Sequence, residues 1–281
     1  MSHRTGRHAQ EILAAQRPDG IWGACFHSLA QPGKAPLTTE QALRRLAALG
    51  FTRQDEPIRR CVDVMAASLR GERRIDGYRE KGLDWALFEQ LMLAAWIRRF
   101  DPRQPDALAF ARRWAAVIEA AFRRDALDEA AFREAYDRAF PEADPACRPV
   151  GLSPFYHAML LPGMLTPDAE ARFIDHLLTR HDGMYYVYPA PLIHPPAIFA
   201  SRETSRWLAA LELLAPFACA GDKLHFAAAY LCLNAGPDGQ WDLGPGAADR
   251  VYLPLSDAWR SPALRRADCT ERIRAFLDRI T

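Results

Sequence analysis

Apolar residues recur at helical spacing along almost the whole chain, and no segment shows the strict alternation of a half-buried β-strand. The clearest example follows Asp84, a residue type that caps helices. Its apolar positions are three or four residues apart, at Trp85, Phe88, Leu91, Met92, Ala95 and Trp96. Residues so spaced share one face of a helix, which is then buried against other helices. The pattern predicts an all-α fold.

Start and stop signals divide the rest of the chain into further helices. A threonine cap and Gly50 bound a helix over 39–49, because glycine readily adopts the left-handed conformation that ends helices. An acidic pair followed by Pro57 opens the next helix, which runs to about Leu69. The same kinds of signal predict helices at 106–122, 128–140, 154–161, 167–180, 201–217, 222–233 and 270–280.

One kind of turn, Asp-Gly followed closely by an aromatic residue, occurs four times. The copies are Asp19-Gly20-Ile21-Trp22, Asp76-Gly77-Tyr78, Asp182-Gly183-Met184-Tyr185 and Asp238-Gly239-Gln240-Trp241. The aspartates are 57, 106 and 56 residues apart, which fits a period of about 55 residues with one copy skipped. Two helices and their loops fill such a period. An even distribution of unrelated Asp-Gly turns is the alternative.

The first of these turns belongs to a longer motif. Residues 16–22 read QRPDGIW and match the QxxxGxW repeat of terpenoid cyclases and protein prenyltransferases. Residues 234–244 (NAGPDGQWDLG) resemble a second copy, with Ala235 in the place of the glutamine. The chain therefore resembles that superfamily, in which helix hairpins close into an α-α toroid. The resemblance implies one toroid domain over 1–281, a helix-hairpin barrel of about 10–12 helices.

The catalytic motifs of the terpenoid cyclases are missing. In that family DxDD supplies a protonated carboxyl group, which requires a raised pKa, and DDxxD holds magnesium. Neither motif occurs, and the nearest acidic run, at 125–129, does not fit the pattern.

The zinc site of the protein prenyltransferases is also incomplete. Asp182 and His225 stand where the resemblance places two zinc ligands, but Met184 occupies the position of the cysteine. Methionine is a poor zinc ligand, and an ordinary turn next to an unrelated helix explains the same residues. No cofactor is predicted, because neither zinc nor magnesium has a complete set of ligands.

The segment 184–200 (MYYVYPAPLIHPPAIFA) is aromatic, proline-rich and free of charge. A loop of this kind is suited to line an apolar pocket, where aromatic faces stabilise a carbocation. The predicted ligand-lining residues are Tyr185, Tyr186, Tyr188, Phe199 and Trp207. The predicted catalytic residues are Asp182 as acid or anchor, His194 as base and His181 orienting Asp182. The alternative is a rigid connector packed over helix ends.

Acids and arginines alternate between Asp249 and Cys269. Arginine forks in such a stretch bind a diphosphate or another anion. The same residues also suit internal ion pairs that fix a long closing loop, with Asp268 or Thr270 capping the last helix.

Composition restricts the compartment and the partners. The net charge of +1 argues against nucleic acid, and no apolar stretch approaches the length of about 18 residues that suggests a membrane span. Six scattered cysteines are expected to be free thiols in a reducing, cytoplasmic setting. The oligomeric state stays open.

The leading hypothesis is a protein that handles a small hydrophobic, isoprenoid molecule in a central cavity, by carbocation-type cyclisation or prenyl transfer. A binding or scaffold toroid that lost this chemistry is the first alternative. The second is a carbohydrate-active α-α barrel, which needs two facing carboxylates.

Overall fold

The computed structural model describes residues 3–27, 37–75, 79–124 and 126–281. Within these ranges the chain forms eleven α-helices, two short 3-10 helices and no β-strand, which confirms the predicted all-α class. The α-helices are α1 (Arg7–Ala14), α2 (Thr39–Ala48), α3 (Glu56–Leu69), α4 (Trp85–Phe100), α5 (Pro105–Ala121), α6 (Glu129–Ala139), α7 (Pro154–Leu160), α8 (Pro167–Thr179), α9 (Arg202–Leu214), α10 (Ala220–Leu233) and α11 (Pro262–Ile280).

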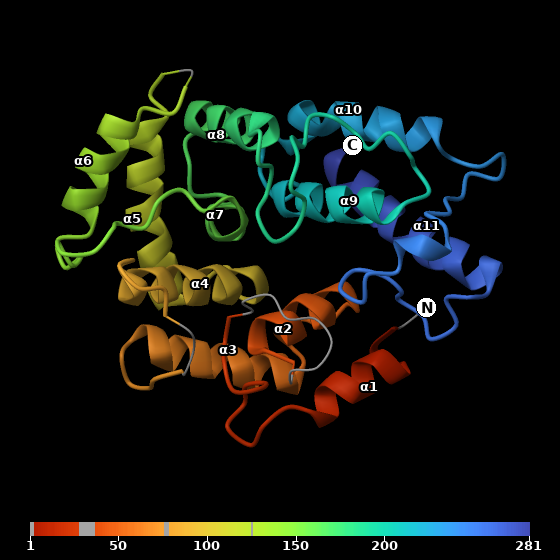
Figure 1. Cartoon of the computed structure of the whole chain (residues 1–281), viewed down its shortest axis with the longest axis horizontal. Coiled ribbons are helices and arrows are strands. Elements are labelled where there is room, and N and C mark those ends of the chain that lie inside the picture. The colour runs from red at the N-terminus through yellow and green to blue at the C-terminus, as the bar shows by residue number, and fades with distance from the viewer. Residues whose placement is uncertain (1–2, 28–36, 76–78, 125) are drawn as a thin grey trace.

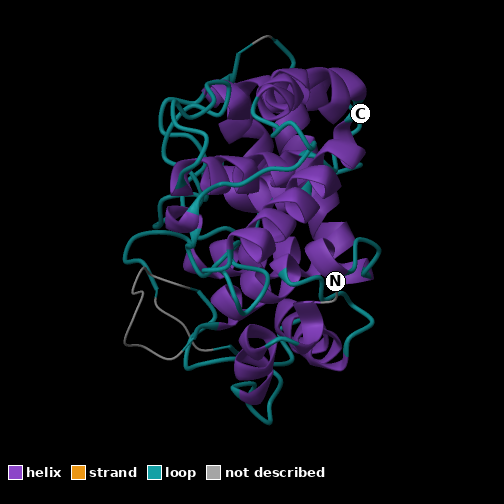
Figure 2. Ribbon diagram, turned by 90° about the vertical axis from the view of Figure 1, so that its right-hand side faces the viewer, coloured by secondary structure: helices purple, strands orange, loops and turns teal. Residues whose placement is uncertain are grey.

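The helices lie on two sides of the molecule and at its two ends (Figure 1). In Figure 1, α1–α4 lie along one side and α8–α10 along the other, with α5 and α6 at one end and α11 at the opposite end. Helix α7 lies between the two sides and packs against α4 and α9. Figure 2 shows the helices edge-on, with long loops gathered over one face.

Helix α2 begins at the predicted threonine cap. The Thr38 hydroxyl accepts a hydrogen bond from the backbone N–H of Gln41, and the Gln41 side chain accepts one from the N–H of Thr38. This reciprocal capping box satisfies two backbone donors that the first turn of a helix leaves unpaired. The helix is followed by Gly50 at φ +85°, the predicted stop signal.

Two of the predicted turns are built in the same way. The indole N–H of Trp22 donates to the carbonyl of Ile12, and that of Trp241 donates to the carbonyl of Leu231, both at 2.7 Å. The backbone N–H of each tryptophan donates to a threonine hydroxyl of another helix, at 3.0 Å in both cases. Both rings are buried, so each tryptophan joins the end of one helix to another helix.

The third turn does not repeat this arrangement. Tyr185, at the tryptophan position of the third turn, is 67% exposed, and the neighbouring Met184 is buried instead. The turn at 76–78 lies outside the described residues, as does Asp125 of the acidic run.

Two helical segments differ from the prediction. Helix α1 was not among the predicted helices, and α11 begins at Pro262 rather than 270. Asp268 and Thr270 therefore lie inside α11 and do not cap it. The polar side chains of 262–269 indicate a loop in the sequence, but in the structure they belong to a helix that packs beside a loop. Asp268 accepts hydrogen bonds from the backbone N–H groups of Leu255 and Ser256.

The turn glycines Gly183 and Gly239 offer a matched test of the packing, because φ is positive at both. A Cβ atom at Gly183 would overlap the carbonyl oxygens of Tyr188 and Ala190, whereas one at Gly239 would meet open space. We expect Gly239→Ala to cost about 1 kcal/mol of unfolding free energy through backbone strain. Gly183→Ala should cost about 1–3 kcal/mol more, because the neighbouring loop must move. Urea denaturation of both variants measures the difference, and equal costs would contradict this packing.

Candidate functional site

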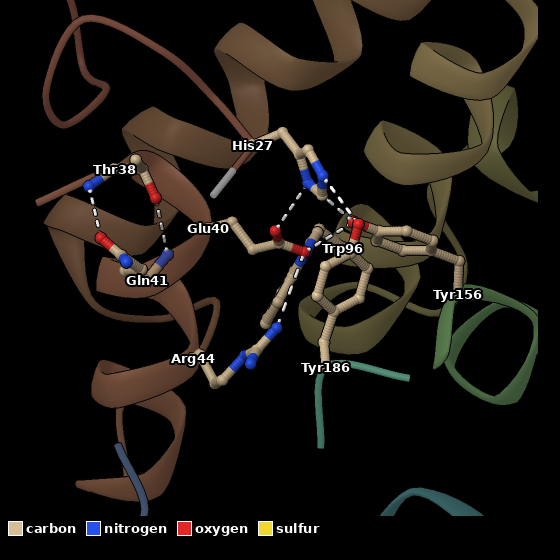
Figure 3. Close-up of polar contacts among 8 residues, drawn as sticks. All are labelled: His27, Thr38, Glu40, Gln41, Arg44, Trp96, Tyr156 and Tyr186. Atoms are coloured by element: carbon tan, nitrogen blue, oxygen red, sulfur yellow. Dashed lines mark hydrogen bonds and ion pairs between the residues drawn. The ribbon is translucent and has the colours of Figure 1, made fainter. Parts of the chain in front are cut away.

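A buried carboxylate, Glu40, lies in the first turn of α2 and is 1% exposed. Its Oε2 lies 3.0 Å from Nδ1 of His27, and its Oε1 accepts hydrogen bonds from the indole of Trp96 and the hydroxyl of Tyr156, both at 3.0 Å. Figure 3 shows these side chains converging on the carboxylate from the preceding loop, α4 and α7. We call Glu40, His27, Trp96, Tyr156 and Tyr186 the Glu40 cluster.

The cluster stabilises the ionised form of Glu40. Burial by itself raises the pKa of a carboxyl group, because the charged form loses its hydration. Here the hydrogen bond from His27 and the positive charge of Arg44 outweigh burial and lower the pKa of Glu40 to about 2. The Arg44 guanidinium lies 3.9 Å from Glu40 Oε1, one helical turn further along α2. Glu40 is therefore negatively charged at neutral pH.

His27 connects the carboxylate to the tyrosine-rich loop. Its Nδ1 lies 3.0 Å from Glu40 Oε2, and its Nε2 lies 3.0 Å from the Tyr186 hydroxyl. Tyr186 has φ +73°, a strained conformation for a residue with a side chain. Such strain persists only where surrounding contacts hold it, and it often marks functional sites. Burial, followed by the negative charge of Glu40, raises the pKa of Tyr186, so its hydroxyl stays protonated at neutral pH.

A cavity of about 260 Å³ adjoins the cluster on the side of Arg44 and Trp96, which both contribute to its wall. Side chains from α2, α4, α7, α9 and α11 line it, together with the loop at Tyr252 and Leu255. The larger apolar members are Trp96, Phe155, Met159, Leu213, Leu255 and Phe276. The charged members are Arg44, Arg99, Arg272, Arg279, Glu212 and Glu271. The wall of the cavity thus combines apolar side chains with arginines.

The three predicted catalytic residues lie outside this lining. Asp182, His181 and His194 are all exposed. Asp182 pairs with Arg180 at 2.6 Å; slight burial raises its pKa, but this pairing outweighs it and lowers the pKa overall. A lowered pKa keeps the carboxyl group ionised at neutral pH, so Asp182 is suited to anchor a cation rather than to donate a proton.

The five predicted ligand-lining residues also lie outside the wall of the cavity. Tyr186 belongs to the Glu40 cluster through His27. Trp207 is fully buried and donates its indole N–H to the carbonyl of Leu192, so it anchors the aromatic loop. Tyr188 is buried, Phe199 contacts the ring of Tyr230, and Tyr185 is largely exposed. These contacts agree with the alternative of a connector packed over helix ends, although ligand binding by the loop stays a prediction.

Sequence analysis did not find His27, Glu40, Arg44 or Tyr156. A glutamate in a first turn usually reflects a favourable interaction with the helix dipole in solvent, and nothing in the local sequence marks Glu40 as buried. Trp96 was placed correctly on the apolar face of its helix, but its indole N–H has a polar partner that only the fold supplies.

Two arginines of the C-terminal segment form internal ion pairs of the kind that one of the two interpretations predicted. Arg265 binds Asp242 through two hydrogen bonds, and Arg266 pairs with Asp238. Of the described residues, no three His, Cys, Asp or Glu side chains are grouped so that they would hold a metal ion. In the same ranges, no helix combines the length and apolar character needed to cross a membrane.

Comparisons with models of protein families, with curated proteins and with solved structures find no match for this chain.

The lowered pKa of Glu40 predicts a pH-dependent contribution to stability. The stabilisation is fully present above the ordinary pKa of 4.5 and is lost as the pH falls towards 2. The difference in unfolding free energy between the natural protein and Glu40→Gln should shrink by about 2 kcal/mol from about pH 6 to about pH 3.

Urea denaturation at both pH values measures this change. Glu129→Gln is the matched control, because Glu129 is an exposed glutamate that also lies in the first turn of a helix. Glu129→Gln should change the unfolding free energy only slightly at both pH values. A pH-independent effect of Glu40→Gln would show that the buried carboxylate is not ionised as described.

Proposed function

We propose that the chain folds as an α-α toroid, similar to that of terpenoid cyclases and protein prenyltransferases, and binds an apolar isoprenoid ligand in its central pocket. The observation that carries the proposal is the composition of the cavity wall. The lining comes from α2, α4, α7, α9 and α11. Along the chain, each of these helices is separated from the next by one helix outside the lining, except that α5 and α6 both lie between α4 and α7. An inner ring of alternate helices is the arrangement expected of a toroid.

The size and character of the wall support an apolar ligand. Trp96, Phe155 and Phe276 supply aromatic surface, and small residues such as Ala209 and Ala275 leave room between them. The volume of about 260 Å³ lies just below the range of about 300–1,000 Å³ that is common for small-molecule sites. A short isoprenoid, or one end of a longer one, is therefore the expected size.

The lining gives less support to the carbohydrate alternative. That reaction requires two carboxylates free to act on either side of a glycosidic bond. Only Glu212 and Glu271 line the cavity, and Glu212 is held by Arg272 at 2.8 and 3.0 Å. Cyclisation or prenyl transfer by Asp182 and His194 rests on the sequence alone, so ligand binding is the function proposed here.

Native mass spectrometry of the protein mixed with geraniol, a short isoprenoid alcohol, tests this proposal. We expect a one-to-one complex that releases geraniol on denaturation. Ala275→Trp should abolish the complex, because the new indole fills the cavity. The matched control is Ala229→Trp, on an exposed part of α10 outside the lining, which should bind as the natural protein does. Absence of a complex, or equal binding by Ala275→Trp, would contradict the proposal.

A further inference from the structure

The cavity wall carries more positive than negative charge. Four arginines and two glutamates line it. Glu212 is already engaged by Arg272, whose guanidinium also binds the hydroxyl and the carbonyl of Ser205. The second carboxylate, Glu271, accepts a hydrogen bond from His3 at 3.1 Å. Both carboxylates are thus engaged by other residues, although Glu212 still attracts Arg99 electrostatically.

Two of these arginines, Arg99 of α4 and Arg279 of α11, come from different helices to the same cavity. Neither forms an ion pair with any residue in the part of the chain that the structure describes. Partial loss of hydration, followed by repulsion from Arg279, lowers the pKa of Arg99. Glu212 offsets only part of this effect, and an anion bound between the two arginines would stabilise both cations.

Arg44 adds a third cation with unused hydrogen-bond donors. Its guanidinium packs over the Phe155 ring, 4.7 Å from the ring centre. Its Nε and Nη2 atoms are buried and have no hydrogen-bond partner in the described part of the chain. Glu40 attracts Arg44 from 3.9 Å but already accepts hydrogen bonds from the three cluster donors. Buried donors without a partner lower the stability of the fold unless a ligand or water accepts their hydrogen bonds.

We propose that the cavity binds an amphiphile whose oxyanion, a carboxylate or a phosphate, is held by Arg44, Arg99 and Arg279. The apolar part of the ligand packs against Trp96, Met159 and Phe276. Arginine suits this task because its planar fork donates paired hydrogen bonds to the oxygens of carboxylates and phosphates. The inference rests on the proposed function, because it assigns the chemical class of the ligand in the same cavity.

Isothermal titration calorimetry with octyl phosphate, octanoate, octanol and inorganic phosphate tests the inference. The variants are Arg99→Gln and Arg279→Gln, singly and together, since both residues are exposed to solvent and tolerate exchange better than the partly buried Arg44. Arg206→Gln is the matched control, because Arg206 is an exposed arginine of α9 outside the lining.

We expect at least one anionic amphiphile to bind about tenfold or more tightly than octanol, and the double variant to lose about that factor. Arg206→Gln should bind as the natural protein does. Preference for octyl phosphate over octanoate would identify a phosphate as the anion, and the reverse a carboxylate.

Other outcomes separate the two proposals. Equal affinity for octanol and the anionic amphiphiles, unchanged in the double variant, would overturn the oxyanion site and leave the apolar pocket in place. Inorganic phosphate binding as tightly as octyl phosphate would overturn the role of the apolar wall. Failure of every probe to bind would overturn the proposed function, and the oxyanion inference with it.

Discussion

The ionised carboxylate of Glu40 is the interaction on which the geometry of the site depends. A buried charge is tolerated only where hydrogen bonds and opposite charge replace its lost hydration. Its partners come from separate parts of the chain: His27 precedes α2, Trp96 belongs to α4, and Tyr156 belongs to α7. Each donor must stay in place for the charge to remain satisfied. The carboxylate therefore fixes three structural elements relative to α2.

This arrangement has a direct consequence for the cavity. Trp96 uses its indole N–H on Glu40 and presents its ring to the cavity wall. Arg44 lies one turn from Glu40, with its guanidinium 3.9 Å from the carboxylate, and belongs to the same wall. The negative charge of Glu40 thus orients both Trp96 and Arg44, which interact with its carboxylate and also line the cavity. Arg99 and Arg279 complete a wall in which apolar surface and positive charge are adjacent, as an amphiphilic anion requires.

Local sequence signals predicted most of the helices, because caps, proline and the spacing of apolar residues act within a few residues of one another. They also predicted the equivalent turns at Trp22 and Trp241. The candidate site was not predictable in this way. Burial of Glu40, and the approach of Arg99 to Arg279, arise from packing between distant segments. A single glutamate or arginine in the sequence does not indicate such packing. The unusual composition of the charge-free loop drew attention to His194, and the Asp-Gly turn before it drew attention to Asp182. The arginines of the cavity are unremarkable in an arginine-rich chain.

A crystal structure of the protein with octyl phosphate tests the central claim most directly, since it locates both ends of an amphiphile. The account predicts density for the alkyl chain between α4, α7 and α11, along Trp96 and Phe276, with the phosphate between Arg99 and Arg279. Density against the exposed Tyr185 of the aromatic loop, with the cavity unchanged, would contradict the account and favour the loop as the binding surface.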